Sequence, residues 1–348
     1  MQINDSRLNG LKILVTGAGG PAGYGLLERL SRSLPNAVLH AADMSPLASG
    51  LYSVLPDRRH LLPSGSDENF ALVVRGICRL HHIDLLIPTV DCELEALAEA
   101  REDLRESNVR VAVPSRTCLA TCLDKYALTV ALDGTVPIPK TTLWKGGPFD
   151  TSHRFPLVAK PRSSSGGRGV MMIESPSELR SLPTNGSYIL CEYLPGAEYS
   201  VDVFRSREGN VLAAVPRERL RVDSGVAITA RTVHDQTLER LAAAAVDRID
   251  LHGTANVQLR RDVTGVPRLL EINPRFPGTM ALTVAAGVDI PTLAVLDAMN
   301  LPLPMSPLSF DDVAIVRQWT ERVIDPSELE RMGVSPASGA AGRLAEAS

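Results

Sequence analysis

Side chains that could bind a metal ion together with phosphate gather in a short run of the C-terminal half. Glu271 and Asn273 stand in Glu-Ile-Asn-Pro-Arg at the end of an apolar segment, and Gln258 lies in the apolar segment before it. Alternate residues of a β-strand point to the same face, so Glu271 and Asn273 share a side, and a hairpin would bring Gln258 beside them. Their oxygens suit Mg²⁺, which proteins usually share with substrate phosphates. The spacing predicts a metal site, and a strand that ends in a polar turn is the alternative.

Two positively charged segments complement this cluster. Arg275 closes the same run with a bidentate cation that could neutralise a transferring phosphoryl group. Upstream, a basic loop of small residues begins at Lys160 and contains Gly166 and Gly167. Its backbone amides could close over phosphate oxygens, because glycine permits close approach. The sequence has no Walker A run, G-x-x-x-x-G-K-S/T, so the loop does not predict a P-loop enzyme, and a solvent-exposed hairpin is its alternative.

A third segment joins the end of one predicted strand to the start of the next. It runs from Glu192 through Tyr193 and Leu194 to Glu198. Backbone groups of such an extended crossing can bind an adenine edge, and the carboxylate of Glu198 can accept hydrogen bonds from ribose hydroxyls. An ordinary proline-glycine turn is the alternative for this segment alone.

The first third of the chain must form a platform for these segments. Apolar strands are expected at residues 11–16, 38–42, 83–88 and 109–113, separated by amphipathic helices at 21–33, 68–80 and 93–107. This alternation predicts a parallel sheet covered on both faces, a Rossmann-like domain. Its first turn, residues 17–23, loosely resembles a dinucleotide fingerprint, with Asp43 closing the second strand. Ala22 stands at the last glycine of that pattern and Pro21 interrupts it, so a tight, purely structural turn is the alternative to NAD binding.

The remaining chain predicts a second architecture. After a helical stretch at 115–132, Pro137 and Pro139 break the helix and start a new domain. Strands are expected at 157–160, 170–174, 188–193, 198–204, 211–215, 227–233, 255–260 and 268–272, with helices at 236–249 and after 272. The composition beyond residue 325 is typical of a flexible tail. The predicted domains are therefore 1–115, 116–204 and 205–325, followed by a tail at 326–348.

Composition narrows the possible partners and locations. The 348 residues are 44% hydrophobic, enough for more than one core, and the net charge of −4 is spread along the chain. Neither nucleic acid nor a membrane is an expected partner, since there is no basic cluster and no apolar run near the roughly 20 residues that span a bilayer. The polar start lacks the plan of a signal peptide, which predicts a cytoplasmic protein. The five cysteines lack C-x-x-C spacing and are expected to be reduced, and His81-His82 is expected to end a helix rather than bind metal.

Together the three chemical segments resemble the ATP-grasp superfamily. The nearest likeness is one ATP-grasp half of the carbamoyl-phosphate synthase large chain, and the first domain is similar to its pre-ATP-grasp domain. The resemblance extends over residues 11–297 and implies a fold that is α/β and α+β, with a Rossmann-like domain before a two-lobed ATP-grasp fold. It implies contacts with the ATP phosphates from two lysines, Lys125 and Lys160, and a covering turn at Gly166 and Gly167.

The resemblance also assigns the other candidate residues. Adenine would lie at Glu192, Tyr193 and Leu194, and ribose at Glu198. The metal ligands would be Gln258, Glu271 and Asn273. The catalytic residues would be Arg275, which steadies the phosphorylated intermediate, and Lys160.

The implied activity is that of an ADP-forming carboxylate-amine ligase. Mg-ATP, with Mn²⁺ as the alternative cation, would phosphorylate a small-molecule carboxylate, and an amine would displace phosphate from the acyl phosphate. Arg217 and Arg219 alternate on one predicted strand and could bind the acid, unless they form a solvated surface pair; Arg231 and Arg317 are further candidates. With one ATP-grasp unit and no glutaminase domain, carbamoyl-phosphate synthesis is not expected. A homodimer is among the expected assemblies. The alternative functions are an NAD-dependent oxidoreductase and a catalytically silent nucleotide-binding regulatory protein.

Overall fold

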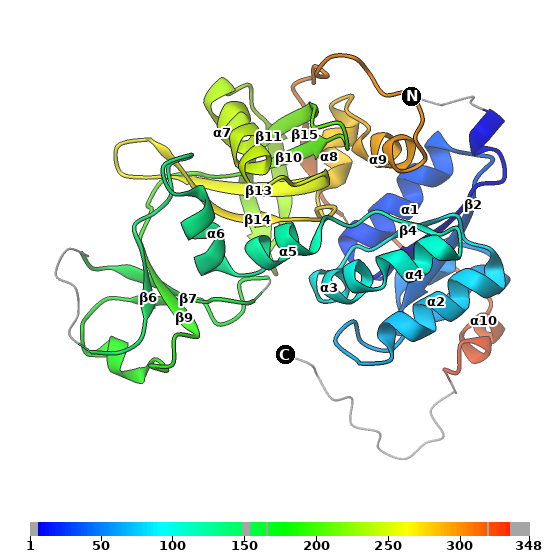
Figure 1. Ribbon diagram of the computed structural model, residues 1–348, viewed down its shortest axis with the longest axis horizontal. Coiled ribbons are helices and arrows are strands. Elements are labelled where there is room, and N and C mark those ends of the chain that lie inside the picture. The colour runs from blue at the N-terminus through cyan, green and yellow to red at the C-terminus, as the bar shows by residue number, and fades with distance from the viewer. Residues whose placement is uncertain (1–5, 148–153, 165, 319, 335–348) are drawn as a thin grey trace.

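The computed structural model describes residues 6–147, 154–164, 166–318 and 320–334. The described residues form three sheets (Figure 1): one of five strands, one of four and one of six. In the described part of the chain, no helix is long and apolar enough to cross a membrane. The five cysteines are free thiols, as expected.

The first sheet is parallel, with strand order β3-β2-β1-β4-β5. Its strands are β1 (Lys12–Thr16), β2 (Val38–Asp43), β3 (Arg59–Leu61), β4 (Leu85–Ile87) and β5 (Arg110–Val111). Alternate residues of β1 pack into two different cores, Ile13 and Val15 on one face and Leu14 on the other. The first face is covered by α1 (Pro21–Ser33), and the second by α2 (Phe70–His81) and α4 (Arg101–Glu106). The predicted parallel sheet covered on both faces is confirmed.

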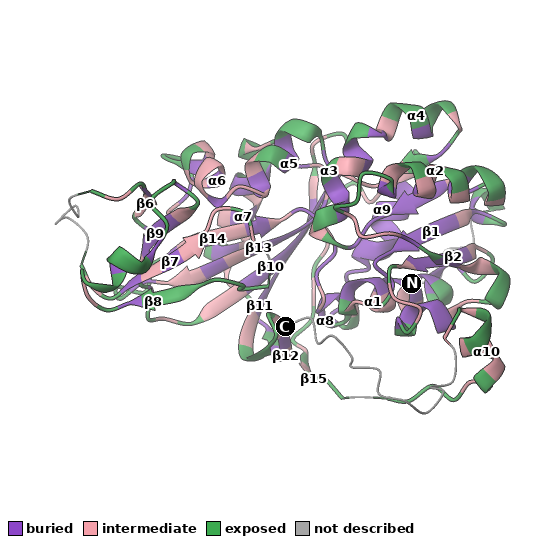
Figure 2. Ribbon diagram, turned by 90° about the horizontal axis from the view of Figure 1, so that it is seen from below, coloured by how far each residue is buried: buried purple, intermediate pink, exposed green. Residues whose placement is uncertain are grey.

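The second sheet is small and antiparallel. It has the strand order β6-β9-β7-β8, with β6 (Thr141–Trp144), β7 (Leu157–Pro161), β8 (Met171–Ile173) and β9 (Tyr188–Glu192). It encloses a separate small core with the 3-10 helix η4 (Glu178–Ser181), and Figure 2 shows that β8 is largely exposed. Two short helices, α5 (Arg116–Cys122) and α6 (Lys125–Leu132), connect this sheet to the first domain.

The third sheet is antiparallel, with the strand order β14-β13-β10-β11-β12-β15. Its strands are β10 (Glu198–Arg205), β11 (Val211–Asp223), β12 (Val226–Thr232), β13 (Gly253–Arg261), β14 (Pro267–Asn273) and β15 (Ala314–Val316). One face packs on α7 (Gln236–Arg248), which Asp235 caps by accepting hydrogen bonds from two backbone amides. The other face shares a core with α9 (Ile290–Ala298) and with α1 of the first domain. The first and third sheets therefore form one continuous structure through this core.

Several elements differ from their predicted form. The helix expected at 93–107 is two helices, α3 (Asp91–Glu99) and α4, which meet at Ala100. The boundary predicted between residues 204 and 205 falls inside β10, whose hydrogen bonds belong to the third sheet. Strand β11 continues eight residues beyond the expected 215, to Asp223. One of the two expected late helices is α8 (Met280–Ala285), and the other is α9.

The start of the predicted tail is ordered, so that prediction is wrong for residues 326–334. Helix α10 (Pro326–Arg331) begins after Asp325, whose side chain accepts from the Ser327 amide. Glu328 forms a salt bridge of 2.6 Å with Arg59 of β3, and Leu329 packs against the first core. An apolar contact and an ion pair thus hold this segment on the first domain. Residues 335–348 lie outside the described residues.

Candidate active site

A cavity of about 530 Å³ lies between the second and third sheets and reaches the first domain. Fourteen of the residues predicted for the site from the sequence line this one cavity: Lys125, Lys160, Gly166, Gly167, Glu192, Tyr193, Leu194, Glu198, Arg217, Arg219, Gln258, Glu271, Asn273 and Arg275. Arg231 and Arg317 are not among the lining residues of the described chain. The fold therefore collects segments that are up to 150 residues apart in sequence, from Lys125 to Arg275.

The oxygen-bearing cluster lies on two neighbouring strands. Gln258 of β13 is directly paired with Glu271 of β14, just before a bulge in the ladder. Asn273 lies two residues further along β14, and its Nδ2 donates to Glu271 Oε1 at 3.1 Å. The three side chains are thus close enough to offer a carboxylate and two amide oxygens to one hard cation.

A cation from helix α6 faces this cluster. Lys125 is the first residue of α6, and its Nζ lies 3.9 Å from Glu271 Oε2 and donates to the Ser164 carbonyl at 2.6 Å. Burial lowers the pKa of Lys125, an effect that Glu271 opposes and Lys160 reinforces. Two ammonium groups and a carboxylate therefore share this part of the cleft, an arrangement that a bound polyphosphate would complement.

The start of α6 is tied to the strand that carries Lys160. Asp124 caps α6 by accepting from two backbone amides, and it also accepts from Arg162 Nε at 3.1 Å. The Lys125 amide donates to the Arg162 carbonyl at 3.0 Å. These bonds fix Lys125 relative to β7, so the two lysines are positioned together.

The glycine-rich loop contributes Ser164, Gly166 and Gly167 to the lining of the cleft. Gly166 and Gly167 have φ angles of +66° and +74°, in the left-handed region that favours glycine. A side chain on Gly225, in the hairpin between β11 and β12, would meet Gly166 Cα at 3.3 Å. The second and third sheets therefore approach one another through backbone alone at this point.

The far end of the cleft holds paired charges. Glu192 accepts from the Lys140 amide at 3.2 Å, and Leu194 is buried beside it. Glu198 forms a 2.9 Å salt bridge with Arg219, which also donates to the Gly225 carbonyl. Glu198, predicted to bind ribose, thus already uses one carboxylate oxygen to pair with Arg219, which was predicted to bind the acid substrate.

Arg217 lies deeper than Arg219 on the same strand. It is almost fully buried, and its Nη2 meets Asp202 Oδ1 at 2.6 Å. Asp202 also accepts from Asn256 at 2.8 Å and from Thr283 at 2.5 Å. Among the described residues, the buried Nε atoms of Arg217 and Arg219 have no hydrogen-bond partner. Both arginines line the cavity.

Arg275 forms a contact that sequence analysis missed. Its Nε and Nη2 donate to the two carboxylate oxygens of Asp91, at 2.7 Å and 2.8 Å. Asp91 is the first residue of α3 in the first domain and lines the same cavity. The only sequence signal was an acid at the start of a helix after a strand, where it complements the helix dipole. This bidentate pair joins the first domain to the end of β14.

Two family models match the chain. One is described as an ATP-grasp in the biosynthetic pathway with Ter operon and covers residues 185–321, which include the oxygen-bearing cluster. The other is described as a PylC-like N-terminal domain and covers residues 13–112. The chain thus resembles the ATP-grasp superfamily over residues 185–321. The predicted resemblance is thereby confirmed.

Solved structures share the ATP-grasp fold at low identity. Biotin carboxylase from Campylobacter jejuni, in complex with β,γ-ATP, gives a TM-score of 0.70 at 16% identity over 86% of this chain and 73% of that one. N5-carboxyaminoimidazole ribonucleotide synthetase from Thermotoga maritima gives 0.68 at 18% identity, over 87% and 79%. L-amino acid ligase from Bacillus licheniformis gives 0.65 at 17% identity, over 84% and 74%. The predicted Rossmann-like domain followed by a two-lobed ATP-grasp fold is confirmed.

The first glycine-rich turn, residues 17–23, has a packing explanation. A side chain on Gly23 would meet the Gly17 carbonyl oxygen at 2.3 Å. Helix α1 can therefore pack this close to the turn only because residue 23 is glycine. Asp43 accepts from the Gly19 amide at 2.7 Å and from the Ser45 amide at 3.0 Å. Its carboxylate therefore holds the turn in place at the position where a dinucleotide ribose would need it.

A larger cavity of about 800 Å³ lies on the other side of Arg275. Its lining is rich in arginine, but these side chains have partners within the fold. Arg101 donates to the carbonyls of Val113 and Pro114, Arg110 to that of Ala298, and Arg207 pairs with Asp297. The cavity between the second and third sheets, by contrast, contains the oxygen-bearing cluster together with Lys125 and Lys160.

Proposed function

We propose that this ATP-grasp chain is an ADP-forming ligase that activates a carboxylate as an acyl phosphate and joins the acyl group to an amine. One observation carries the proposal. Lys125 and Lys160 share a cleft with Gln258, Glu271 and Asn273, so positive charge and metal-type oxygens face the same space. That combination suits the β- and γ-phosphates of ATP.

ATP would lie along the cleft with its phosphates at the lysines. The 3.9 Å between Lys125 Nζ and Glu271 Oε2 is too long for a tight hydrogen-bonded pair, so a phosphate oxygen can replace part of that contact. Gly166 and Gly167 would cover the phosphates with backbone amides. Adenine is assigned to the segment 192–194, and Glu198 can offer the ribose the oxygen that Arg219 does not hold.

The donor set fits Mg²⁺, with Mn²⁺ as the alternative cation. Glu271 would supply the negative ligand, and Gln258 and Asn273 would supply neutral amide oxygens, leaving further positions for water and phosphate. When bound, the cation would neutralise charge on the phosphates. Among the ligands, only Glu271 would have to keep its charge for this role.

The substrate carboxylate would attack the γ-phosphorus, forming an oxygen–phosphorus bond as the bond to the bridging oxygen breaks and ADP leaves. Arg275, held by Asp91, would steady the acyl phosphate by hydrogen bonds and charge. The amine nitrogen would then attack the acyl carbon and lose a proton, and inorganic phosphate would leave. The unpaired Nε atoms of Arg217 and Arg219 are the donors proposed for the acid.

The alternative functions have less support. An NAD-dependent oxidoreductase would use Asp43 for a ribose, but that carboxylate already accepts hydrogen bonds from the Gly19 amide of the turn and from the Ser45 amide. A silent nucleotide-binding protein would be expected to lack part of the metal set, and Gln258, Glu271 and Asn273 are all present in one cleft. A homodimer and a cytoplasmic location stay predictions.

The test is the identity of the products. Acids and amines are first screened in pairs for phosphate release from Mg-ATP, and the active pair is then followed by ³¹P NMR. ADP and inorganic phosphate are expected in equal amounts. AMP and pyrophosphate would overturn the acyl-phosphate mechanism, because an adenylating enzyme exposes the α-phosphate instead. Calorimetry that finds tight NAD binding and no ATP binding would overturn the proposal as a whole.

A further inference from the structure

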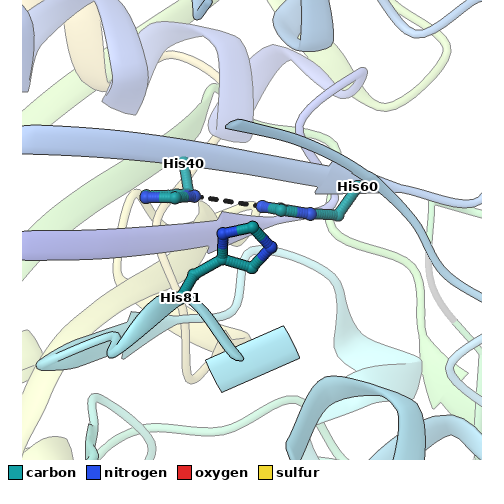
Figure 3. A group of neighbouring side chains, drawn as sticks. All are labelled: His40, His60 and His81. Carbon is teal, nitrogen blue, oxygen red and sulfur yellow. Dashed lines mark hydrogen bonds between the residues drawn. The ribbon is translucent and has the colours of Figure 1, made fainter. Parts of the chain in front are cut away.

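Three histidines meet in the first domain, at the edge of the parallel sheet. His40 lies on β2, His60 on the edge strand β3 and His81 at the end of α2. Figure 3 shows their imidazole rings turned toward one another from these three elements. His40 and His60 are buried, with 4% and 9% of their surface exposed, and His81 is half-buried.

The rings are close enough to share one ion. One nitrogen of each ring lies within 4.8 Å of a nitrogen of both others. His40 Nδ1 and His60 Nε2 are 3.0 Å apart, and the ring centroids of His60 and His81 are 4.5 Å apart. Three nitrogens around a tetrahedral zinc ion would be about 3.3 Å from one another, since each bond is about 2.0–2.1 Å. His81 would have to move on the order of 1 Å, which its half-buried place at a helix end allows.

We propose that His40, His60 and His81 form a binding site for a divalent transition ion of the Zn²⁺ class, which ties β2, β3 and α2 together. Imidazole nitrogens suit Zn²⁺, whereas Mg²⁺ prefers oxygen, so the two kinds of site in this chain select different metals. A water molecule would complete the coordination. None of the three histidines lines the ATP-grasp cleft, so the site is structural rather than catalytic.

The protonation of the cluster agrees with metal binding. Burial, assisted by the nearby His81, lowers the pKa of His60 to about 4, and burial with His81, Arg58 and Lys12 does the same for His40. Both rings are therefore neutral at physiological pH and bring lone pairs to the site. The hydrogen between His40 Nδ1 and His60 Nε2 would move to the other nitrogen of its ring when the ion binds. Neither histidine would then have to release a proton to the solvent.

Neighbouring charges reduce the affinity without removing the site. Lys12 Nζ donates to the His81 carbonyl at 3.0 Å, and Arg58 also lies close to His40, so both oppose a bound cation. The negative charge of Asp57 raises the pKa of His40 and His60, and it would favour a bound cation.

No spacing of histidines in the sequence indicates this site. His40 and His60 lie 41 and 21 residues before His81, so no short histidine motif exists. His82 does end α2, in the left-handed conformation with a φ angle of +54°, as the sequence predicted for this pair. The sequence favoured helix termination over metal binding for His81-His82. The proposed site uses His81 alone, with His40 and His60, which the parallel sheet brings beside it.

The test uses the full chain, stripped with a chelator and then held in excess Mg²⁺ to fill the oxygen site. Zn²⁺ is titrated in competition with a coloured chelator, and thermal unfolding is followed with and without Zn²⁺. One zinc ion per chain and a higher melting temperature with zinc are expected. Substitution of Co²⁺ should give the intense visible absorption of a four-coordinate ion.

Variants then locate the ion. His60→Ala and His81→Ala should each weaken zinc binding by at least about tenfold, since losing a group that only hydrogen-bonds to a metal ligand already costs that much. His82→Asn is the matched control, because asparagine tolerates the left-handed conformation, and it should bind zinc as the wild type does. Circular dichroism and ATP binding confirm that each variant is folded, with His81→Gln as the replacement for one that is not. Failure of the folded wild type to bind one zinc ion, or unchanged affinity in both alanine variants, overturns the proposal.

Discussion

Glu93 allows a sharp test of the interior of the first domain. It lies on α3 with 6% of its surface exposed, and its Oε2 accepts a hydrogen bond from Thr16 at 2.6 Å. Burial raises its pKa from 4.5 to about 7, the Thr16 bond works against this shift, and the nearby Asp43 adds to it. The native state therefore keeps a proton that an unfolded chain loses.

The shift sets the sign and the size of a pH effect on stability. Below about pH 4.5 Glu93 is protonated in both the native and the unfolded state, and the raised native pKa makes its full contribution to the free energy of unfolding. As the pH rises from about 4.5 to about 7 that contribution is lost, because the unfolded state ionises first. At 1.36 kcal/mol for each pKa unit, the loss is about 3 kcal/mol. Glu93→Gln keeps the shape and an acceptor for Thr16 but cannot ionise.

The assay compares unfolding of the wild type and Glu93→Gln in urea across that pH range. The free energy of unfolding of the variant relative to the wild type should rise by about 3 kcal/mol between acid and mildly alkaline solution. Effects of all other groups cancel in the difference. Glu95→Gln, on the exposed side of the same helix, is the matched control and should show no such rise. Parallel stability curves for the wild type and Glu93→Gln would refute the assignment of a buried, protonated carboxyl.

Three substitutions in the cleft have separate expected outcomes. Glu271→Gln should abolish turnover by removing the negative metal ligand, and raised Mg²⁺ should restore part of the rate in a phosphate-release assay. Lys160→Ala should also abolish turnover, but with no Mg²⁺ rescue, because a phosphate contact is lost; activity equal to the wild type in either variant would exclude its role. Asp91→Asn should lower kcat by about ten- to a hundredfold through a displaced Arg275, with calorimetric ATP affinity unchanged; a loss confined to ATP binding would contradict that role.

Much of the site was predictable because it rests on local geometry. Two-residue periodicity puts Glu271 and Asn273 on one face in any strand, and β14 has this form. The hairpin to β13 then leaves Gln258 opposite Glu271. The apolar strands of the first third likewise allow little except a doubly covered sheet.

The missed features depend on contacts between distant segments or on polar sequence. Asp91 and Arg275 are separated by 184 residues, and nothing local marks either as the other's partner. The outer half of β11 contains Arg217, Arg219 and Arg221 and lacks a clear apolar alternation, so the strand was predicted to end early. Its polar side chains are there because they face the cleft and solvent rather than a core.

The distribution of cores indicates which part of the enzyme is free to move. The first and third sheets share one apolar core through α1 and α9, and Arg275 and Asp91 add a bidentate ion pair across the same junction. The four-stranded sheet has its own small core and meets the rest through polar contacts, among them Lys125 with Ser164 and Arg268 with Glu192. Polar contacts exchange with water at far lower cost than a shared core opens. Closure over ATP is therefore expected to move the four-stranded sheet, with Lys160 and the glycine loop, toward the proposed metal and acyl-phosphate site on the third sheet.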